Sequence, residues 1–258
     1  MTDAERVVGS DRVLAVLLEL AEHPGGITLD DLAQRVNGSK PTVHRALATL
    51  RKAGLASQSS RGVYELGDEF LRLAYRFQDA RPETARIEPL LRKLATEFGE
   101  TAHFAILDGA EVVYRAKVDP PVGAIRLTST IGGRNSAYAT AVGKLLLSYE
   151  VSSLSSLEDR LGGAVLPALT ANTLTSVPAL YADIAASGSR GYGLDDQENE
   201  IGVNCVALPV FLEPGRAPSG AVSVSGLAYR RGVASLVSSV GAIRGVIEAH
   251  LGKGAAGY

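Results

Sequence analysis

The sequence is poor in the residues that most often mark disulfide, metal or catalytic chemistry. It contains one cysteine, Cys205, and four histidines among 258 residues. A single cysteine excludes an internal disulfide framework and is typical of a reducing compartment. None of the histidines (His23, His44, His103 and His250) forms a metal-ligand spacing with another histidine or with Cys205. The sequence therefore predicts no metal and no other cofactor.

Recognisable catalytic motifs are also missing. No G-x-S-x-G nucleophile elbow occurs. Gly143 and Lys144 look like the end of a phosphate-binding loop, but Tyr138 stands at the position of its first glycine and Leu145 replaces the Ser or Thr. Cys205 has no activating base that the sequence reveals, and a lone buried cysteine is normally inert. We expect that the protein is not an enzyme.

Long apolar stretches are absent as well. Each is interrupted by Glu, Gly or Ser well short of the roughly 20 residues that a membrane-spanning helix needs. The first residues, MTDAERVVGSDR, are polar and lack the apolar region of a signal peptide. Hydrophobic residues make up 46% of the chain, enough for a substantial core, and the length allows two domains. We therefore expect a cytoplasmic protein.

Positive charge is concentrated in one short segment. The chain has a formal net charge of -2 and a calculated pI of about 6.1, so any contact with a polyanion must be local. The 30 residues from Arg35 to Tyr64 contain six basic side chains and no acidic one. The six are Arg35, Lys40, Arg45, Arg51, Lys52 and Arg61. A basic patch in an acidic protein is typical of a nucleic-acid-binding module.

The basic segment belongs to a helix-turn-helix pattern. Apolar residues at helical spacing predict a first helix capped by Ser10 and a short second helix capped by Thr28, with Asp31 as its capping-box-like partner. A tight turn then leads to a third helix, capped by Ser39 and ended by Gly54. A short helix, a tight turn and a second helix predict a DNA-binding module whose last helix enters the major groove.

The third helix and the hairpin after it supply the candidate DNA contacts. Strands near Leu55–Gln58 and Val63–Leu66 predict a hairpin whose tip, residues 59–62, forms a basic wing. The candidate DNA-binding residues are Ser39, Lys40, Thr42, Val43, His44, Arg45, Arg51 and Arg61. Val43, with Leu47 and Leu50, also falls on the face that should pack inward. Arg35 is expected to contact a phosphate or to be solvated. The alternative is a small helical domain with a solvated basic face.

An amphipathic segment follows the hairpin. Residues 68–82 predict a linker helix, and a second helix is expected from about Thr84 to Phe98. Apolar positions of the first could form a dimer seam, or they could pack on their own chain, and the pattern does not distinguish the two. The sequence thus predicts a winged helix-turn-helix domain at 1–67, a linker helix at 68–82 and a second domain at 83–258.

The second domain combines strands and helices. Strands are expected at Ala102–Leu107, Glu111–Lys117, Ala124–Thr130, Val203–Phe211 and Ala221–Leu227, and a loop at Gly132–Asn135. Helices are expected at about Thr140–Ser148, Ser152–Leu161, Val177–Ser187 and Val233–Leu251. This is an α+β pattern with a mostly antiparallel sheet.

Several small polar residues in this domain are candidates for a ligand pocket. Ser223 and Ser225 alternate with valines and therefore face one side of a strand. Cys205 lies on another strand after the acidic run Asp195–Glu200, and residues 139–143 open a helix whose free N–H groups attract polar ligand atoms. Together they predict a pocket for a small, oxygen-rich molecule. The alternatives are a solvent-facing strand side for the serines and a solvated loop for the acidic run.

From Ser10 to Leu251 the chain resembles the IclR family of bacterial transcription regulators. The segments that carry the resemblance are ITLDDLAQRVNGSKPTVHRALATLRKAGL in the first domain and YATAVGKLLLS, GYGLDDQENEIGVNCVALPVF and GAVSVSGLAYR in the second. The resemblance implies a winged helix-turn-helix, a linker helix and a GAF-like effector-binding domain. It also implies a homodimer or dimer of dimers on operator DNA and a small organic acid or aromatic effector.

The resemblance further implies which residues contact the effector. They are Ala141, Val142, Asp195, Cys205, Ser223 and Ser225. Some relatives have Gly-Ala in place of Ala141-Val142, so the ligand of a relative is not assumed. The expected function is a ligand-responsive regulator, a repressor of a catabolic operon. The competing hypotheses are an enzyme or binding module whose helix-turn-helix contacts proteins, and a constitutive architectural DNA-binding protein.

Overall fold

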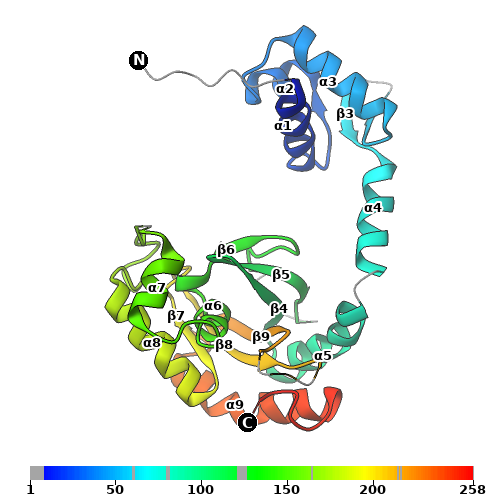
Figure 1. Cartoon of the computed structure of the whole chain (residues 1–258). Coiled ribbons are helices and arrows are strands. Elements are labelled where there is room, and N and C mark those ends of the chain that lie inside the picture. Colours follow the sequence, from blue (N-terminus) through cyan, green and yellow to red (C-terminus); the bar gives the residue numbers. More distant parts are fainter. Residues whose placement is uncertain are drawn as a thin grey trace. The chain divides into compact units, whose positions relative to one another are not determined.

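The computed structural model describes residues 9–59, 62–79, 82–120, 127–163, 165–213, 215 and 217–257. The chain divides into two compact units, Met1–Arg81 and Pro82–Tyr258 (Figure 1). Within the described ranges, no helix is both long and apolar enough to cross a membrane.

The first unit is a winged helix-turn-helix. Its elements are α1 (Gly9–Ala21), β1 (Ile27–Thr28), α2 (Leu29–Arg35), α3 (Lys40–Lys52), β2 (Ala56–Gln58), β3 (Val63–Leu66) and α4 (Asp68–Asp79). The strands form an antiparallel sheet in the order β1-β3-β2. Val16, Leu32 and Leu47, one from each of the first three helices, are fully buried in one core. The helix-turn-helix and its hairpin are as predicted, whereas the two-residue strand β1 was not predicted.

The helix starts agree with the predicted caps only in part. Thr28 caps α2, because its Oγ1 accepts a hydrogen bond from the Asp31 N–H at 3.2 Å. Ser39 occupies the cap position of α3 but makes no capping hydrogen bond, since its Oγ lies 2.9 Å from the Thr42 Oγ1 instead. The prediction for Ser10 was wrong: α1 already includes Gly9, so Ser10 lies inside the helix.

Helix α4 packs little of its surface within its own unit. It buries no described residue, and its apolar side chains Phe70, Leu71, Leu73, Tyr75 and Phe77 are between 39% and 64% exposed. Packing of α4 on its own chain was one of the two alternatives, and it stays a prediction. A dimer seam formed by its exposed apolar side chains, the other alternative, also stays a prediction.

The second unit is built on one antiparallel sheet of six strands. Its strands are β4 (Thr101–Asp108), β5 (Glu111–Val118), β6 (Arg134–Ser136), β7 (Gly193–Asp196), β8 (Val203–Val210) and β9 (Gly220–Leu227). Their order is β6-β5-β4-β9-β8-β7, and neighbours in this order are antiparallel. The helices are α5 (Pro82–Phe98), α6 (Ala141–Leu147), α7 (Leu154–Leu161), α8 (Val177–Arg190) and α9 (Val233–Leu251), with a short 3-10 turn at Ala137–Ala139. The predicted α+β class is confirmed.

Helices cover both faces of the sheet (Figure 1), and each face carries a separate apolar core. Alternate strand residues point to opposite faces. Large side chains such as Phe104 and Val222 meet α5 and α9, whereas the small Ala105 and Ala221 meet α6 and its neighbours. The small residues let α6 lie close to the sheet.

Two glycines show how closely α6 is packed. A Cβ at Gly143 would lie 2.2 Å from the Ala137 carbonyl oxygen, and one at Gly193 would lie 2.0 Å from the Ala141 carbonyl oxygen. Both contacts are with backbone, which cannot move aside as a flexible side chain can. The Gly in the Gly143-Lys144 pair thus serves packing, with no phosphate loop around it.

Two predictions for this domain were wrong in detail, and the strand β7 was not predicted. The strand expected at Ala124–Thr130 is absent over 127–130, and 124–126 lie outside the described residues. Part of the loop expected at Gly132–Asn135 is the edge strand β6, and Asp195 and Asp196 of the acidic run belong to the edge strand β7. Both edge strands are short and lack alternating apolar residues, so their pairing depends on the neighbouring strand.

Candidate functional site

Helix α3 separates its side chains into a buried face and an exposed face. Leu47 is fully buried and Leu50 is 3% exposed, as predicted, whereas Lys40, His44 and Arg45 are exposed. Val43 is also fully buried, so its place among the candidate DNA-contacting residues was wrong. Its side chain packs in the core and cannot reach a base.

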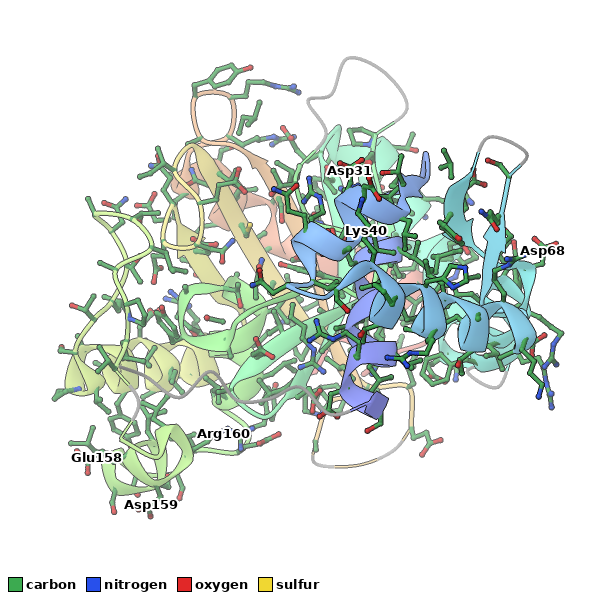
Figure 2. The ribbon with its side chains drawn as sticks, turned by 90° about the horizontal axis from the view of Figure 1, so that it is seen from above. Asp31, Lys40, Asp68, Glu158, Asp159 and Arg160 are labelled. Carbon is green, nitrogen blue, oxygen red and sulfur yellow. The ribbon has the colours of Figure 1, made fainter. Side chains whose placement is uncertain are left out.

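The exposed face of α3 carries an ordered set of polar side chains. Ser39 Oγ lies 2.9 Å from Thr42 Oγ1, and Arg45 Nη2 donates to the same Thr42 oxygen at 3.5 Å. These three residues form a hydrogen-bonded row along the start of the helix. Figure 2 labels Asp31 on α2 and Lys40 on α3. The Lys40 Nζ pairs with the Asp30 Oδ2 at 2.8 Å, on the exposed surface.

Two of the remaining basic residues, Arg51 and Arg35, can be located in the structure. Arg51 Nη1 donates to the Gln58 Oε1 of strand β2 at 2.9 Å, which links the end of α3 to the wing. Arg61 lies outside the described residues. Arg35 is exposed, and its Nη1 lies 3.5 Å from the Glu19 Oε1; its contact with a phosphate stays a prediction. The first unit thus presents a cationic, mostly polar surface of the kind that enters a major groove.

A second candidate site is a cavity of about 180 Å³ in the second unit. Residues from strands β4, β5, β7, β8 and β9, the start of α6 and the segment 127–135 line it. All six residues named from the resemblance lie on its wall: Ala141, Val142, Asp195, Cys205, Ser223 and Ser225. They come from four segments that are distant in sequence, and the sheet brings them together.

The serines and the first acid are not solvated. Ser223 and Ser225 are 4% and 3% exposed, and Asp195 is 3% exposed. This burial excludes the alternative that the two serines face solvent. It also excludes the alternative that Asp195 lies in a solvated loop. Cys205 pairs with both Asp195 and Ser225 in the strand register, so three polar candidates form one row across the sheet.

His103 is the main cavity residue that the sequence did not reveal. It pairs with Ser223 in the register of β4 and β9. Its Nε2 lies 2.8 Å from the Ser129 Oγ and its Nδ1 lies 3.4 Å from the Ser223 Oγ. Burial lowers its pKa to about 3, and the positive charge of Lys117 adds to the effect. The imidazole is therefore neutral at physiological pH and offers one donor and one acceptor.

The pKa of Asp195 is shifted in the opposite direction from that of His103. Burial raises its pKa to about 7, while hydrogen bonds from the Glu198 and Asn199 N–H groups to its Oδ1, at 2.7 and 3.4 Å, oppose the rise. The nearby Glu198 carboxylate contributes to the rise as well. Near neutral pH this carboxyl group therefore exists in both protonation states.

Tyr114 and Cys205 add neutral groups to the wall. Burial raises the pKa of Tyr114 to about 12 and raises the pKa of the Cys205 thiol well above its ordinary value. The Tyr114 hydroxyl accepts a hydrogen bond from the Asn135 Nδ2 at 3.2 Å, and its ring lies 5.0 Å from the His103 ring. A protonated thiol of this kind is a poor nucleophile, in agreement with the absence of catalytic motifs.

Hydrogen bonds hold the segment 127–130 against the cavity wall. Lys117 Nζ donates to the carbonyl oxygens of Leu127 and Ser129, both at 2.8 Å. Thr128 Oγ1 donates to the Glu200 Oε2 at 3.0 Å. These bonds join β5 and the turn after β7 through a segment that has no strand pairing of its own.

Lys144 of α6 holds the turn after β7 through an ion pair with Glu198. Its side chain is 1% exposed, and its Nζ lies 2.5 Å from the Glu198 Oε1 and 2.7 Å from the Asp183 Oδ2. Glu198 belongs to the turn that carries Asn199 and Glu200 to the cavity wall. The lysine that looked like part of a phosphate loop is thus a buried ion-pair partner that holds one side of the cavity.

Other wall residues were missed by the sequence, notably Tyr114, Asn135 and Thr140. The available signal for His103 was its place on a predicted strand that is otherwise mostly apolar. Among the described residues, no group of three or more His, Cys, Asp or Glu side chains is placed to hold a metal ion.

Comparison with known proteins identifies the family. A model described as "IclR helix-turn-helix domain" matches residues 10–60, and one described as "Bacterial transcriptional regulator IclR C-terminal" matches residues 83–248. The chain belongs to the IclR family. IclR-family regulators bind operator DNA and small-molecule effectors, so the chain is a DNA-binding transcriptional regulator and not an enzyme.

Individual relatives agree with this assignment. The transcriptional regulator BhcR of Paracoccus denitrificans is 34% identical over 235 residues, which cover 91% of this chain and 82% of BhcR. The acetate operon repressor of Salmonella typhimurium is 34% identical over 220 residues, covering 83% and 78%. The crystal structure of the Thermotoga maritima IclR superposes with a TM-score of 0.77 at 25% identity, covering 94% of this chain and 98% of that one.

Proposed function

We propose that this IclR-family member represses a catabolic operon and that a small organic acid or aromatic metabolite, bound in the cavity, changes its affinity for the operator. The observation that carries the proposal is the convergence of six effector-candidate residues from four sequence segments on one cavity. Relatives that are named as repressors, including one of an acetate operon, support the regulatory direction.

The chemistry of the cavity suits such a ligand. Its volume of about 180 Å³ is below the range of about 300–1,000 Å³ typical of sites for drug-sized molecules, which favours a small metabolite. Hydroxyl groups of Ser223 and Ser225 and the neutral His103 offer hydrogen bonds to ligand oxygens. The tilted pair of His103 and Tyr114 rings offers an aromatic surface.

The proposed mechanism is a shift between arrangements of the DNA-binding heads in a homodimer or a dimer of dimers. A ligand that binds one arrangement more tightly shifts the equilibrium toward it by that difference in affinity. The exposed apolar residues Leu71 and Tyr75 on α4 support a helix–helix contact between subunits. Sedimentation equilibrium of the full chain tests the oligomeric state, and a monomer at all concentrations would exclude this part of the proposal.

Operator binding and effector response are tested separately. Fluorescence anisotropy with the DNA upstream of the protein's own gene should give binding that weakens steeply as salt rises. Adding metabolites to the complex should change that affinity, and Ser223→Ala should blunt the change while it leaves the metabolite-free affinity intact. Binding without dependence on salt or sequence would support a protein-contacting helix-turn-helix instead.

A further inference from the structure

Acidic groups around the cavity are not matched by available cations. Among its described lining residues, Asp195 and Glu200 carry carboxyl groups, and Arg134 carries the one permanent positive charge. The Arg134 guanidinium is already engaged, since Nη1 lies 2.9 Å from the Glu111 Oε2 and Nη2 lies 2.5 Å from the Asp108 Oδ2. A carboxylate ligand would therefore enter a site with carboxyl groups on its wall and no available cation among the described wall residues.

Two carboxylates cannot both stay ionised at short range in a site that excludes water. Of the two wall acids, Glu200 already accepts a hydrogen bond from the Thr128 hydroxyl and is only half-buried. Asp195 is 3% exposed, and both backbone N–H groups that reach it bind Oδ1. This leaves Oδ2 of Asp195 as the oxygen that can carry a proton toward a ligand.

We infer that the cavity binds a small organic acid together with one proton, which Asp195 holds and shares with the ligand carboxylate. The inference rests on the proposed effector site and names the protonation state that the site requires. In the binding step one proton from solvent joins the Asp195 and ligand carboxylates. An O–H bond forms on one of the two groups and donates a hydrogen bond to the other, and no covalent bond breaks.

The surroundings of Asp195 agree with this assignment. The titratable and charged groups near Asp195 are Glu198 and Glu200 in the following turn, Lys144 on α6, Asp183 on α8, Cys205 on β8 and Tyr114 on β5. The same cavity wall carries the neutral His103 of β4 and Arg134 of β6. Lys144 and Arg134 are the cations among these groups, and two carboxylates already bind each of them. Burial keeps the pKa of Asp195 near 7, so the free protein is largely ionised there at pH 8 and takes up the proton on binding.

Calorimetric titration of the full-length protein with matched acid and amide pairs tests the inference. The probes are glycolate, lactate and benzoate with glycolamide, lactamide and benzamide, each at pH 6, 7 and 8 in buffers of different ionisation enthalpy. At least one acid should bind about tenfold more weakly at pH 8 than at pH 6, as a pKa near 7 requires. Proton uptake should rise from near zero at pH 6 to near one at pH 8. Any amide that binds should show neither effect.

Two isosteric variants assign the proton. Asp195→Asn keeps an oxygen acceptor for the Glu198 N–H and should remove the pH dependence of acid binding. Glu200→Gln, the matched control, should retain it. Loss of the dependence in Glu200→Gln alone, or acid binding without proton uptake, overturns the inference. So does failure of every acid to bind at pH 6. If operator binding is normal and salt-dependent in any of these cases, only the proton inference fails and the proposed regulatory function is retained.

Discussion

Two buried titratable groups of the cavity wall, His103 and Asp195, should give the free energy of unfolding opposite dependences on pH. The pKa of Asp195 is 3.8 when unperturbed and about 7 in the folded protein. Between these values the folded state binds more protons than the unfolded state, so stability falls as pH rises. One pKa unit corresponds to about 1.4 kcal/mol, so ionised Asp195 costs up to about 4 kcal/mol above pH 7.

His103 acts in the other direction. Its pKa falls from 6.5 to about 3 on folding, so between these values the unfolded state binds more protons and stability rises with pH. The same conversion gives up to about 5 kcal/mol. From about pH 4 to pH 6.5 the two slopes oppose each other, and their sum in the parent protein should be close to zero. A variant that lacks one of the two titratable groups should therefore show the pH dependence of stability that the other group causes.

The variant Asp195→Asn isolates the acid. Its stability relative to the parent should increase by up to about 4 kcal/mol between pH 4 and pH 8, because the cost of ionising Asp195 is absent. The neighbouring Asp196, exposed on the same strand, supplies the matched control variant Asp196→Asn. Urea unfolding at each pH, with native-state hydrogen exchange of β4 and β9 to follow the second unit, measures the difference. A difference that is constant over this range would refute the reasoning.

Three further changes test other parts of the structure. Arg45→Ala should weaken operator binding by about 1–3 kcal/mol if the side chain reads a base, and unchanged affinity by anisotropy at fixed salt would contradict that role. Leu47→Ala should instead lower the unfolding free energy by about 2–5 kcal/mol, measured by urea denaturation, because it empties a core position. Lys144→Met leaves the buried Glu198 without its ion-pair partner, while Asp183 keeps the Arg190 contact at 3.6 Å. The variant should destabilise the second unit by about 3–5 kcal/mol; an unshifted melting temperature would show that the Lys144 ion pair is dispensable.

Local patterns in the sequence were sufficient for elements whose signals are local. The buried face of α3, including Leu47 and Leu50, follows from helical spacing, and the Thr28 cap follows from the preference of hydroxyl side chains for helix starts. The long strands β4 and β8 were predicted within one residue of their observed limits, because sustained apolar runs between turn residues mark them. Edge strands β6 and β7 were not predicted, because short polar segments pair only when a neighbouring strand is present.

By itself, the sequence determined the family, the winged helix-turn-helix and the six residues to examine for an effector site. The winged helix-turn-helix follows from residue types at a fixed spacing along the chain, and the six residues follow from the resemblance to the family. Only the tertiary structure decided that Lys144 pairs with Glu198 and Asp183 and that His103 faces Ser223. These depend on contacts between segments as far as 120 residues apart. The protonation states of His103 and Asp195 follow in turn, because burial and neighbouring charges, rather than residue type, set a pKa inside a protein.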